Sequence, residues 1–244
     1  MSKKSYRQAI NEALRQEMER DPTVILMGED ISGAGLNAAS QHSQVLYSMF
    51  THIPGLKVVV PSSPYEAKGL LIQSIRDNDP VIFFEHKAMY DVEGEVPDEP
   101  YTIPFGQANV VREGDDVTIV AFGRMVSLAT QAADSLAKKG ISCTVVDPRT
   151  TSPLDTETIQ ETVEETGRLV AVDESHTRCS MASDIVSLVT TNIFGALKAP
   201  PQAVTAPHAP VPFSSALESL YIPSVEKIEA AVMATMGEAD RRAA

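Results

Sequence analysis

The sequence has no tryptophan, only two cysteines and no long apolar run. Cys143 and Cys179 have neither the CxxC spacing of a zinc site nor the density of a disulfide framework, so they indicate neither. No apolar run approaches the roughly 20 residues that a membrane helix needs. The amino-terminal residues become amphipathic at once, without the apolar core of a secretion signal, so we expect a protein of the reducing cytoplasm.

Positive charge is also scarce, because 20 Lys and Arg residues stand against 33 Asp and Glu residues, a formal net charge of −13. Such a surface repels phosphate backbones, and no basic stripe offsets it, so we expect no nucleic-acid partner. A chain of 244 residues, 43% of them hydrophobic, can bury a sizeable core. These values are typical of a soluble globular protein with one large domain or two of ordinary size.

The first 87 residues alternate between helical and strand patterns. Ser5 and Gln8 fit a capping box ahead of an amphipathic helix that should stop before Pro22. Short connections between alternating strands and helices predict a parallel sheet. The expected strands are Val24–Met27, Leu56–Val60 and Val81–Phe84, and a further helix is expected over Pro64–Arg76.

Residues 88–106 carry five prolines or glycines among acidic residues and no periodicity, so we interpret them as a linker. Residues 107–244 then repeat the alternation. The predicted fold is therefore α/β, with two open, mostly parallel sheets flanked by helices, and with domains at 1–87 and 107–244. The strands of the second domain are expected over 117–122, 141–146, 169–172 and 202–205, and its helices around 128–136 and over 155–166, 181–193 and 224–236.

The stretch from Val24 to Phe50 is the best candidate for chemistry. A short apolar strand leads into a loop punctuated by Gly28, Gly33 and Gly35, and His42 follows at the opening of a segment with helical apolar spacing. Polar residues beyond the carboxyl end of a strand are where open α/β sheets bind ligands. The spacing alone leaves a second interpretation open, in which His42 only caps that helix.

Many separated motifs match one family along nearly the whole chain. They include VILMGED, QHSQ, HIPGLKVVVPSSPYEAKGLL, IRDNDPVIFFEHK, GDDVTIVAFGRMV and TAPHAPVPFSSALESLYIP. Together they resemble the β component of thiamine-diphosphate-dependent 2-oxoacid dehydrogenases, most closely that of the acetoin dehydrogenase system. The resemblance implies a transketolase-like pyrimidine-binding domain followed by a transketolase C-terminal-like domain. It also implies oxidative cleavage or decarboxylation with acyl transfer to lipoamide, and leaves acetoin, pyruvate or a branched-chain oxoacid open as the substrate.

The resemblance has one large gap, between Asp30 and Gly33. In the family, a long block at this point supplies further strand–helix units and the glutamate that hydrogen-bonds the aminopyrimidine ring of the cofactor. Its loss removes the group that activates the cofactor, so we expect this chain to be inactive alone. The alternative is a non-catalytic deletion variant that acts only as a folded assembly or scaffold protein.

The resemblance assigns roles to several residues. It places His42 at an active-site position, where a neutral imidazole suits proton transfer. Glu29 could engage the thiamine ring as a substitute for the missing glutamate, although an ordinary loop carboxylate is the interpretation we favour. A helix-end loop matches the family's structural potassium site, and a solvated turn is its alternative. The residues of that loop are Ser74, Ile75, Asp77 and Asp79.

Other polar residues at strand ends have simpler interpretations. The group Glu85, His86 and Lys87 could line a pocket mouth, but we favour a domain junction. Asp173 and Glu174 follow a strand of the second domain, where the family uses the region for packing and assembly, and no third metal ligand is evident. The same interpretation covers two more histidines, His176 and His208.

The family also implies partners. Thiamine diphosphate, with magnesium, is held by an α subunit, and a lipoyl-bearing acyltransferase receives the acyl group. A parallel sheet of only three strands leaves edges and faces uncovered. We therefore expect the chain to self-associate, as a homodimer, over this surface.

Overall fold

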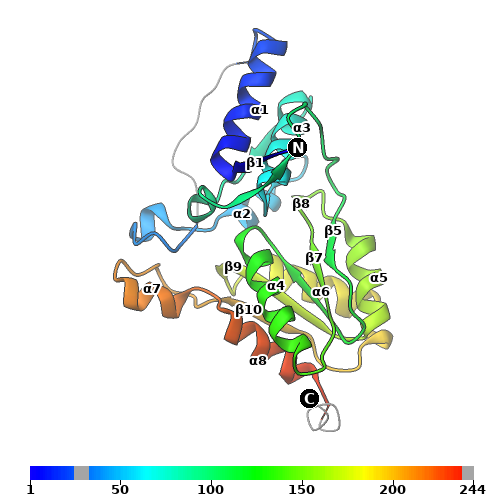
Figure 1. Ribbon diagram of the computed structural model, residues 1–244. Coiled ribbons are helices and arrows are strands. Elements are labelled where there is room, and N and C mark those ends of the chain that lie inside the picture. Colours follow the sequence, from blue (N-terminus) through cyan, green and yellow to red (C-terminus); the bar gives the residue numbers. More distant parts are fainter. Residues whose placement is uncertain (25–32, 238–244) are drawn as a thin grey trace.

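The computed structural model describes residues 1–24 and 33–237, which form an α/β fold with sheets of two, three and five strands (Figure 1). This confirms the fold class predicted from the alternating pattern. The strand expected over Val24–Met27 lies outside the described residues apart from Val24, as does Glu29. No helix within the described ranges is long and apolar enough to cross a bilayer.

The five-stranded sheet has the order β10-β9-β6-β7-β5. Four of its strands are parallel, and only the edge strand β5 runs antiparallel, against β7. The central strands are buried and mostly apolar, as expected where both faces of a parallel sheet are covered. The strands are β5 (Asn109–Arg112), β6 (Val117–Ala121), β7 (Cys143–Asp147), β9 (Leu169–His176) and β10 (Gln202–Ala206).

Two pairs of helices cover this sheet. One core cluster joins its first face to α4 (Arg124–Ala137) and α8 (Val225–Thr235). The other joins the opposite face to α5 (Thr156–Thr166) and α6 (Met181–Asn192). Three of these helices begin at a capping side chain, since Ser180, for example, accepts a hydrogen bond from Ser183 N at the start of α6, whereas α4 begins at Gly123 without one.

The three-stranded sheet combines segments from both halves of the chain. Its order is β3-β2-β8, with β2 (Lys57–Val59) parallel to β3 (Val81–Phe83) and antiparallel to β8 (Thr150–Ser152). The helix α3 (Pro64–Arg76) follows β2 and packs against α1 (Tyr6–Arg20). Because β8 comes from the second half of the chain, the two halves share a sheet. The division into domains at 1–87 and 107–244 stays a prediction.

The segment that we interpret as a linker contains β4 (Glu93–Val96), which pairs antiparallel with β1 (Ser2–Ser5). The Lys68 side chain is fully buried beside it. Its ammonium donates to Glu12 Oε2 at 2.9 Å and to the carbonyl oxygen of Pro97 at 2.7 Å. These contacts tie α1, α3 and the segment after β4 together, since a buried ammonium needs such partners.

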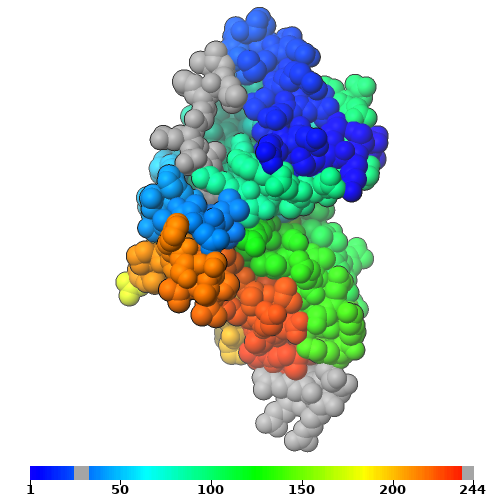
Figure 2. Space-filling model, turned by 60° about the vertical axis from the view of Figure 1, so that its left-hand side comes forward, coloured from blue at the N-terminus to red at the C-terminus, as the bar shows by residue number. Residues whose placement is uncertain are grey.

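Three short helical segments lie near the candidate site described below. They are the 3₁₀ turn η1 (Ser40–His42), α2 (Tyr47–Thr51) and α7 (Ser215–Tyr221). The helical spacing after His42 therefore produces only one short helix, which begins five residues beyond this histidine. In the space-filling view α7, in orange, lies directly against the segment after residue 33, in blue (Figure 2).

Candidate functional site

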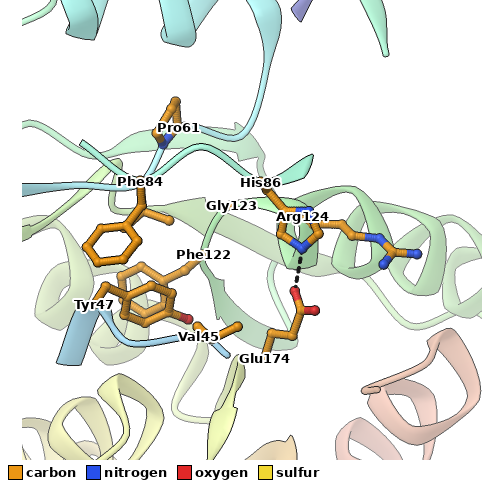
Figure 3. Close-up of a pocket in the computed structure, with 10 residues that line it drawn as sticks. Val45, Tyr47, Pro61, Phe84, His86, Phe122, Gly123, Arg124 and Glu174 are labelled. Atoms are coloured by element: carbon orange, nitrogen blue, oxygen red, sulfur yellow. Dashed lines mark hydrogen bonds and ion pairs between the residues drawn. The ribbon is translucent and has the colours of Figure 1, made fainter. Parts of the chain in front are cut away.

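The carboxyl ends of strands from both larger sheets meet in one place. His86 follows β3, Gly123 and Arg124 follow β6, and Glu174 lies near the end of β9. These residues line a cavity of about 20 Å³ together with Pro61, which follows β2 (Figure 3). Open α/β sheets bind ligands at this edge, so the cluster is the best candidate site in the described structure.

A glycine loop, Gly33–Ala34–Gly35, enters this place and is held by side chains of the second half of the chain. Ala34 N donates to Glu174 Oε1 at 2.9 Å, and Gly35 N donates to Glu218 Oε1 at 2.9 Å. Arg124 donates to the carbonyl oxygen of Ala34 at 3.2 Å. Two carboxylates and one guanidinium thus close the loop onto the five-stranded sheet.

This arrangement requires glycine at two positions of the loop. Gly33 has a φ of +110° and Gly35 a φ of +105°, in the region that side chains rarely adopt. A Cβ on Gly33 would lie 2.6 Å from His86 Nε2, and one on Gly35 would lie 2.5 Å from Arg124 Nη1. The loop therefore approaches both side chains as closely as only glycine allows.

His86 and Glu174 form the polar centre of the site. His86 Nε2 lies 2.8 Å from Glu174 Oε2, and the two side chains are 12% and 4% exposed. Figure 3 shows the imidazole directly above the carboxylate. The other ring nitrogen, Nδ1, is buried and has no hydrogen-bond partner among the described residues. The cavity beside the imidazole has room for one water molecule.

An aromatic wall closes one side of the cavity. The rings of Tyr47 and Phe84 lie 5.9 Å apart in edge-to-face contact, and Phe122 packs against Tyr47. The Tyr47 hydroxyl donates to Asp173, whose carboxylate also accepts from Met181 N at 2.8 Å. Burial raises the pKa of Asp173 and that of Tyr47. The hydrogen bond between them ties α2 to β9 and to the start of α6.

A second buried pair, Glu66 and Asp147, joins α3 to the end of β7. Glu66 accepts from Ser62 Oγ at 2.6 Å and from Arg149 Nε at 3.0 Å. Asp147 accepts from Arg149 N at 2.8 Å. Burial, followed by the charge of Glu66, raises the pKa of Asp147 well above its ordinary value. Two carboxyls so close cannot both ionise readily.

The structure does not place His42 in the cavity at His86. Its side chain is exposed on η1, outside the residues that line that cavity. Glu29 lies outside the described residues, so its candidate role stays a prediction. By contrast, the structure brings together His86 and Glu174, which lie 88 positions apart in the chain.

The expected potassium loop has a protein cation beside it. Lys57 Nζ lies 2.7 Å from Asp77 Oδ1 and 3.0 Å from Asp79 Oδ2. The Ser74 hydroxyl donates within its helix to the carbonyl oxygen of Leu70, at 2.7 Å. Over residues 1–24 and 33–237, no group of three or more His, Cys, Asp or Glu side chains is placed to hold a metal ion. The potassium assignment, which includes Ile75, stays a prediction.

Sequence reasoning missed Glu218 and Arg124 as parts of the site. Arg124 lies two residues beyond a predicted strand, which is a signal that could have pointed to it. Glu218 lies on α7, a helix that we did not predict, and nothing in its local sequence distinguishes it. His176 has a structural environment, because its Nδ1 lies 3.0 Å from the carbonyl oxygen of Pro207 and its ring meets that of His208 edge-to-face.

Comparisons with known protein families match both halves of the chain. Residues 106–228 match the family model described as "Transketolase, C-terminal domain". Residues 32–92 match the one described as "Transketolase, pyrimidine binding domain". The second match begins within two residues of Gly33, at the point where the sequence resemblance has its gap.

Several characterised proteins are similar over most of this chain. It is 61% identical over 204 residues to the acetoin:2,6-dichlorophenolindophenol oxidoreductase subunit beta of Cupriavidus necator, covering 84% of this chain and 60% of that protein. The protein of the same name from Bacillus subtilis is 53% identical over 206 residues, with the same coverage of 84% and 60%. The 2-oxoisovalerate dehydrogenase subunit beta of Bacillus subtilis is 43% identical over 202 residues, covering 82% and 62%. The chain thus spans about 60% of the length of these relatives.

A solved structure shares the fold. The chain described as "Split gene transketolase, inactive beta4 tetramer" superimposes with a TM-score of 0.68 at 24% identity, covering 92% of this chain and 72% of that one. At this identity the likeness concerns the arrangement of helices and strands alone.

Proposed function

This chain belongs to the transketolase C-terminal domain family, and from that premise we propose that it is a shortened β-subunit counterpart of a thiamine-diphosphate-dependent acetoin or 2-oxoacid dehydrogenase. The observation that carries the proposal is the 61% identity to an acetoin oxidoreductase β subunit over 84% of this chain. The name of that relative favours acetoin over pyruvate or a branched-chain oxoacid as the substrate of the system. The expected partners are an α subunit and a lipoyl-bearing acyltransferase, in the cytoplasm.

The described residues do not fit thiamine diphosphate by themselves. The cavity at the strand ends has a volume of about 20 Å³, enough for one water molecule and far too small for an aminopyrimidine ring. Glu174 already binds both His86 Nε2 and the Ala34 amide, which leaves His86 Nδ1 as the ring nitrogen of this pair without a partner among the described residues.

We therefore propose that the isolated chain is inactive, because the segment that would grip and activate the cofactor is missing. In the proposed complex, the exposed His42 is the residue that this chain presents to a cofactor held by the partner. An imidazole there can move a proton during acyl transfer. A role of Glu29 as a substitute for the missing glutamate belongs to the same proposal.

A second candidate function is that of a non-catalytic assembly protein. The closed loop at Gly33–Gly35 favours it, because Glu174 and Glu218 satisfy the amides of Ala34, Gly35 and Asn37, which could otherwise bind a ligand. In this case the fold persists for its contacts with other subunits, and a homodimer covers the uncovered sheet surface.

Reconstitution separates the two candidates. The chain is mixed with the α subunit that belongs to the Cupriavidus necator relative, with thiamine diphosphate and magnesium. Acetoin-dependent reduction of 2,6-dichlorophenolindophenol is then followed by absorbance. We expect no activity from the chain alone, and activity in the mixture supports the enzyme component. Co-elution with the α subunit without activity supports the assembly protein, whereas neither co-elution nor activity contradicts the proposed partnership.

A further inference from the structure

Two backbone amides of the loop after Ala34 bind a carboxylate of the chain itself. Gly35 N donates to Glu218 Oε1 at 2.9 Å, and Asn37 N donates to Glu218 Oε2 at 3.0 Å. Gly35 and Asn37 have φ values of +105° and +54°, both in the left-handed region. Backbone amides that converge on one point in this way form a concavity that binds anions. The loop thus has the donor geometry of a site for one carboxylate, with each oxygen held by one amide.

The helix that brings this carboxylate, α7, is oriented with its leucines outwards. Glu218 is the only buried residue of Ser215–Leu220, whereas Leu217 and Leu220 are 56% and 72% exposed. Helices normally bury leucine and expose glutamate. The helix also begins without a side-chain cap, and of its residues only Tyr221, at its end, belongs to a hydrophobic core cluster. The attachment of α7 to the loop therefore depends largely on the Glu218 carboxylate.

The charged groups beside the loop leave its amides to decide what binds. Arg124 donates to the carbonyl oxygen of Ala34 and adds a positive charge, while Glu174 accepts from Ala34 N and adds a negative one. These two charges offset each other. The loop also reaches the surface, since Leu36 and Asn37 are exposed, and α7 lies over it on the outside of the molecule (Figure 2). A ligand from solvent can therefore reach the amides once α7 has moved.

From these contacts we propose that the loop Gly35–Asn37 is a binding site for a compact carboxylate, and that Glu218 occupies it as an internal ligand that α7 can withdraw. A carboxylate from solution then accepts the two amide hydrogen bonds that Glu218 gives up. Its binding releases α7, whose exposed leucines become available to other contacts. The site is independent of the proposed dehydrogenase function, because it uses no residue assigned to the cofactor.

The test supplies the missing carboxylate from solution. Glu218→Ala removes the side-chain Cγ and the carboxylate, which together have the heavy atoms of acetate. Thermal unfolding of the full chain is followed at constant ionic strength while sodium acetate replaces sodium chloride. We expect the Tm of Glu218→Ala to rise in a saturable way, by about 3–6 °C at ten times the half-saturating concentration. Pivalate has the same charge on a much larger group and should not replace acetate.

Hydrogen exchange measures the two steps separately. In Glu218→Ala, acetate should restore the protection of the Gly35 and Asn37 amides, whereas pivalate should not. In the wild type, these two amides should exchange at least about tenfold faster than the amides of β6 and β9, because withdrawal of α7 exposes them without unfolding the five-stranded sheet. Glu161→Ala removes an exposed carboxylate of α5 and is the matched control, in which acetate should cause no saturable rise in Tm.

Each step can fail on its own. If the Tm of Glu218→Ala responds to acetate no differently from that of Glu161→Ala, Glu218 is only a structural carboxylate and the proposed site is overturned. If Glu218→Ala is unfolded in chloride, the same titration follows the recovery of its circular dichroism, and no recovery in acetate overturns the site as well. Exchange of the wild-type Gly35 and Asn37 amides only as slowly as the strand amides would overturn the withdrawal of Glu218, and this measurement requires no variant.

Discussion

Replacement of Glu218 by glutamine tests whether the closed glycine loop stabilises the fold. The Glu218 side chain is 3% exposed, and its two carboxylate oxygens accept from Gly35 N at 2.9 Å and from Asn37 N at 3.0 Å. Glutamine has the same shape but only one acceptor oxygen. Its NH₂ group would therefore face one of these amides, donor against donor.

The expected cost follows from the lost bonds. A hydrogen bond to a charged group contributes about 1.5–3 kcal/mol, and an amide left facing a donor adds to the loss, so we expect Glu218→Gln to lower the free energy of unfolding by about 2–4 kcal/mol. In a chain of this size each kcal/mol moves the Tm by about 2–4 °C. Urea unfolding, followed by circular dichroism, measures the change.

Glu161→Gln is the matched control, because Glu161 is exposed on the surface of α5. It should change the free energy of unfolding by no more than about 0.5 kcal/mol. Hydrogen exchange should also show that the amides of Gly35 and Asn37 lose protection in Glu218→Gln alone. Equal stabilities for the two variants, or unchanged exchange at these amides, would refute the reasoning.

Three further predictions concern stability and assembly. Gly33→Ala should lower the Tm more than the control Gly55→Ala. Both glycines have a positive φ, but of the two only Gly33 is so close to another group that an added Cβ would meet it, namely the His86 ring at 2.6 Å. The same Tm loss in both variants would contradict the close approach of Gly33 to His86. The pKa of Asp147 is raised in the folded chain. Above the ordinary pKa of an aspartic acid, this carboxyl therefore keeps its proton in the folded chain and loses it in the unfolded chain. Stability should therefore fall as pH rises from about 4 towards the folded pKa, by up to about 1.4 kcal/mol per pH unit. In Asp147→Asn the side chain has no proton to lose, so the free energy of unfolding, measured in urea between pH 5 and 8, should depend less on pH. An unchanged slope would mean that other groups cause the pH dependence. Light scattering should report a dimer at micromolar concentrations, and a monomer throughout that range would count against self-association.

Local signals predicted much of the second half of the fold. The helix expected over 155–166 occurs as Thr156–Thr166, with Asp155 as its N-cap, and the one expected over 181–193 occurs as Met181–Asn192. In the first half, α3 occurs over Pro64–Arg76 as predicted. Each of these helices has both an apolar stripe and a capping residue, so its sequence neighbours suffice to specify it.

Short strands could not be predicted in the same way. The strand β8 has only three residues, and it exists because Val58 and Val59 of β2 pair with it from almost a hundred positions away. Likewise, β4 depends on pairing with β1 at the other end of the first half. A strand of this length has no periodicity to recognise, because its stability comes from long-range pairing.

The candidate site was predictable only in part. The sequence analysis singled out the polar residues at these strand ends, but it interpreted His86 as part of a domain junction and Glu174 as part of a packing region. The pairing of His86 with Glu174 depends on how two sheets meet, which no local pattern contains. Glu218 is a further case, because an acidic residue on a short helix is usually solvated, and its burial against Gly35 follows from tertiary packing.

We propose that the fold persists without the segment that would grip the cofactor. Calorimetric titration of the isolated chain with thiamine diphosphate and magnesium tests this most directly. We expect no heat of binding beyond dilution, because the cavity at His86 and Glu174 has room for only one water molecule. Saturable binding, abolished by removal of magnesium, would contradict it.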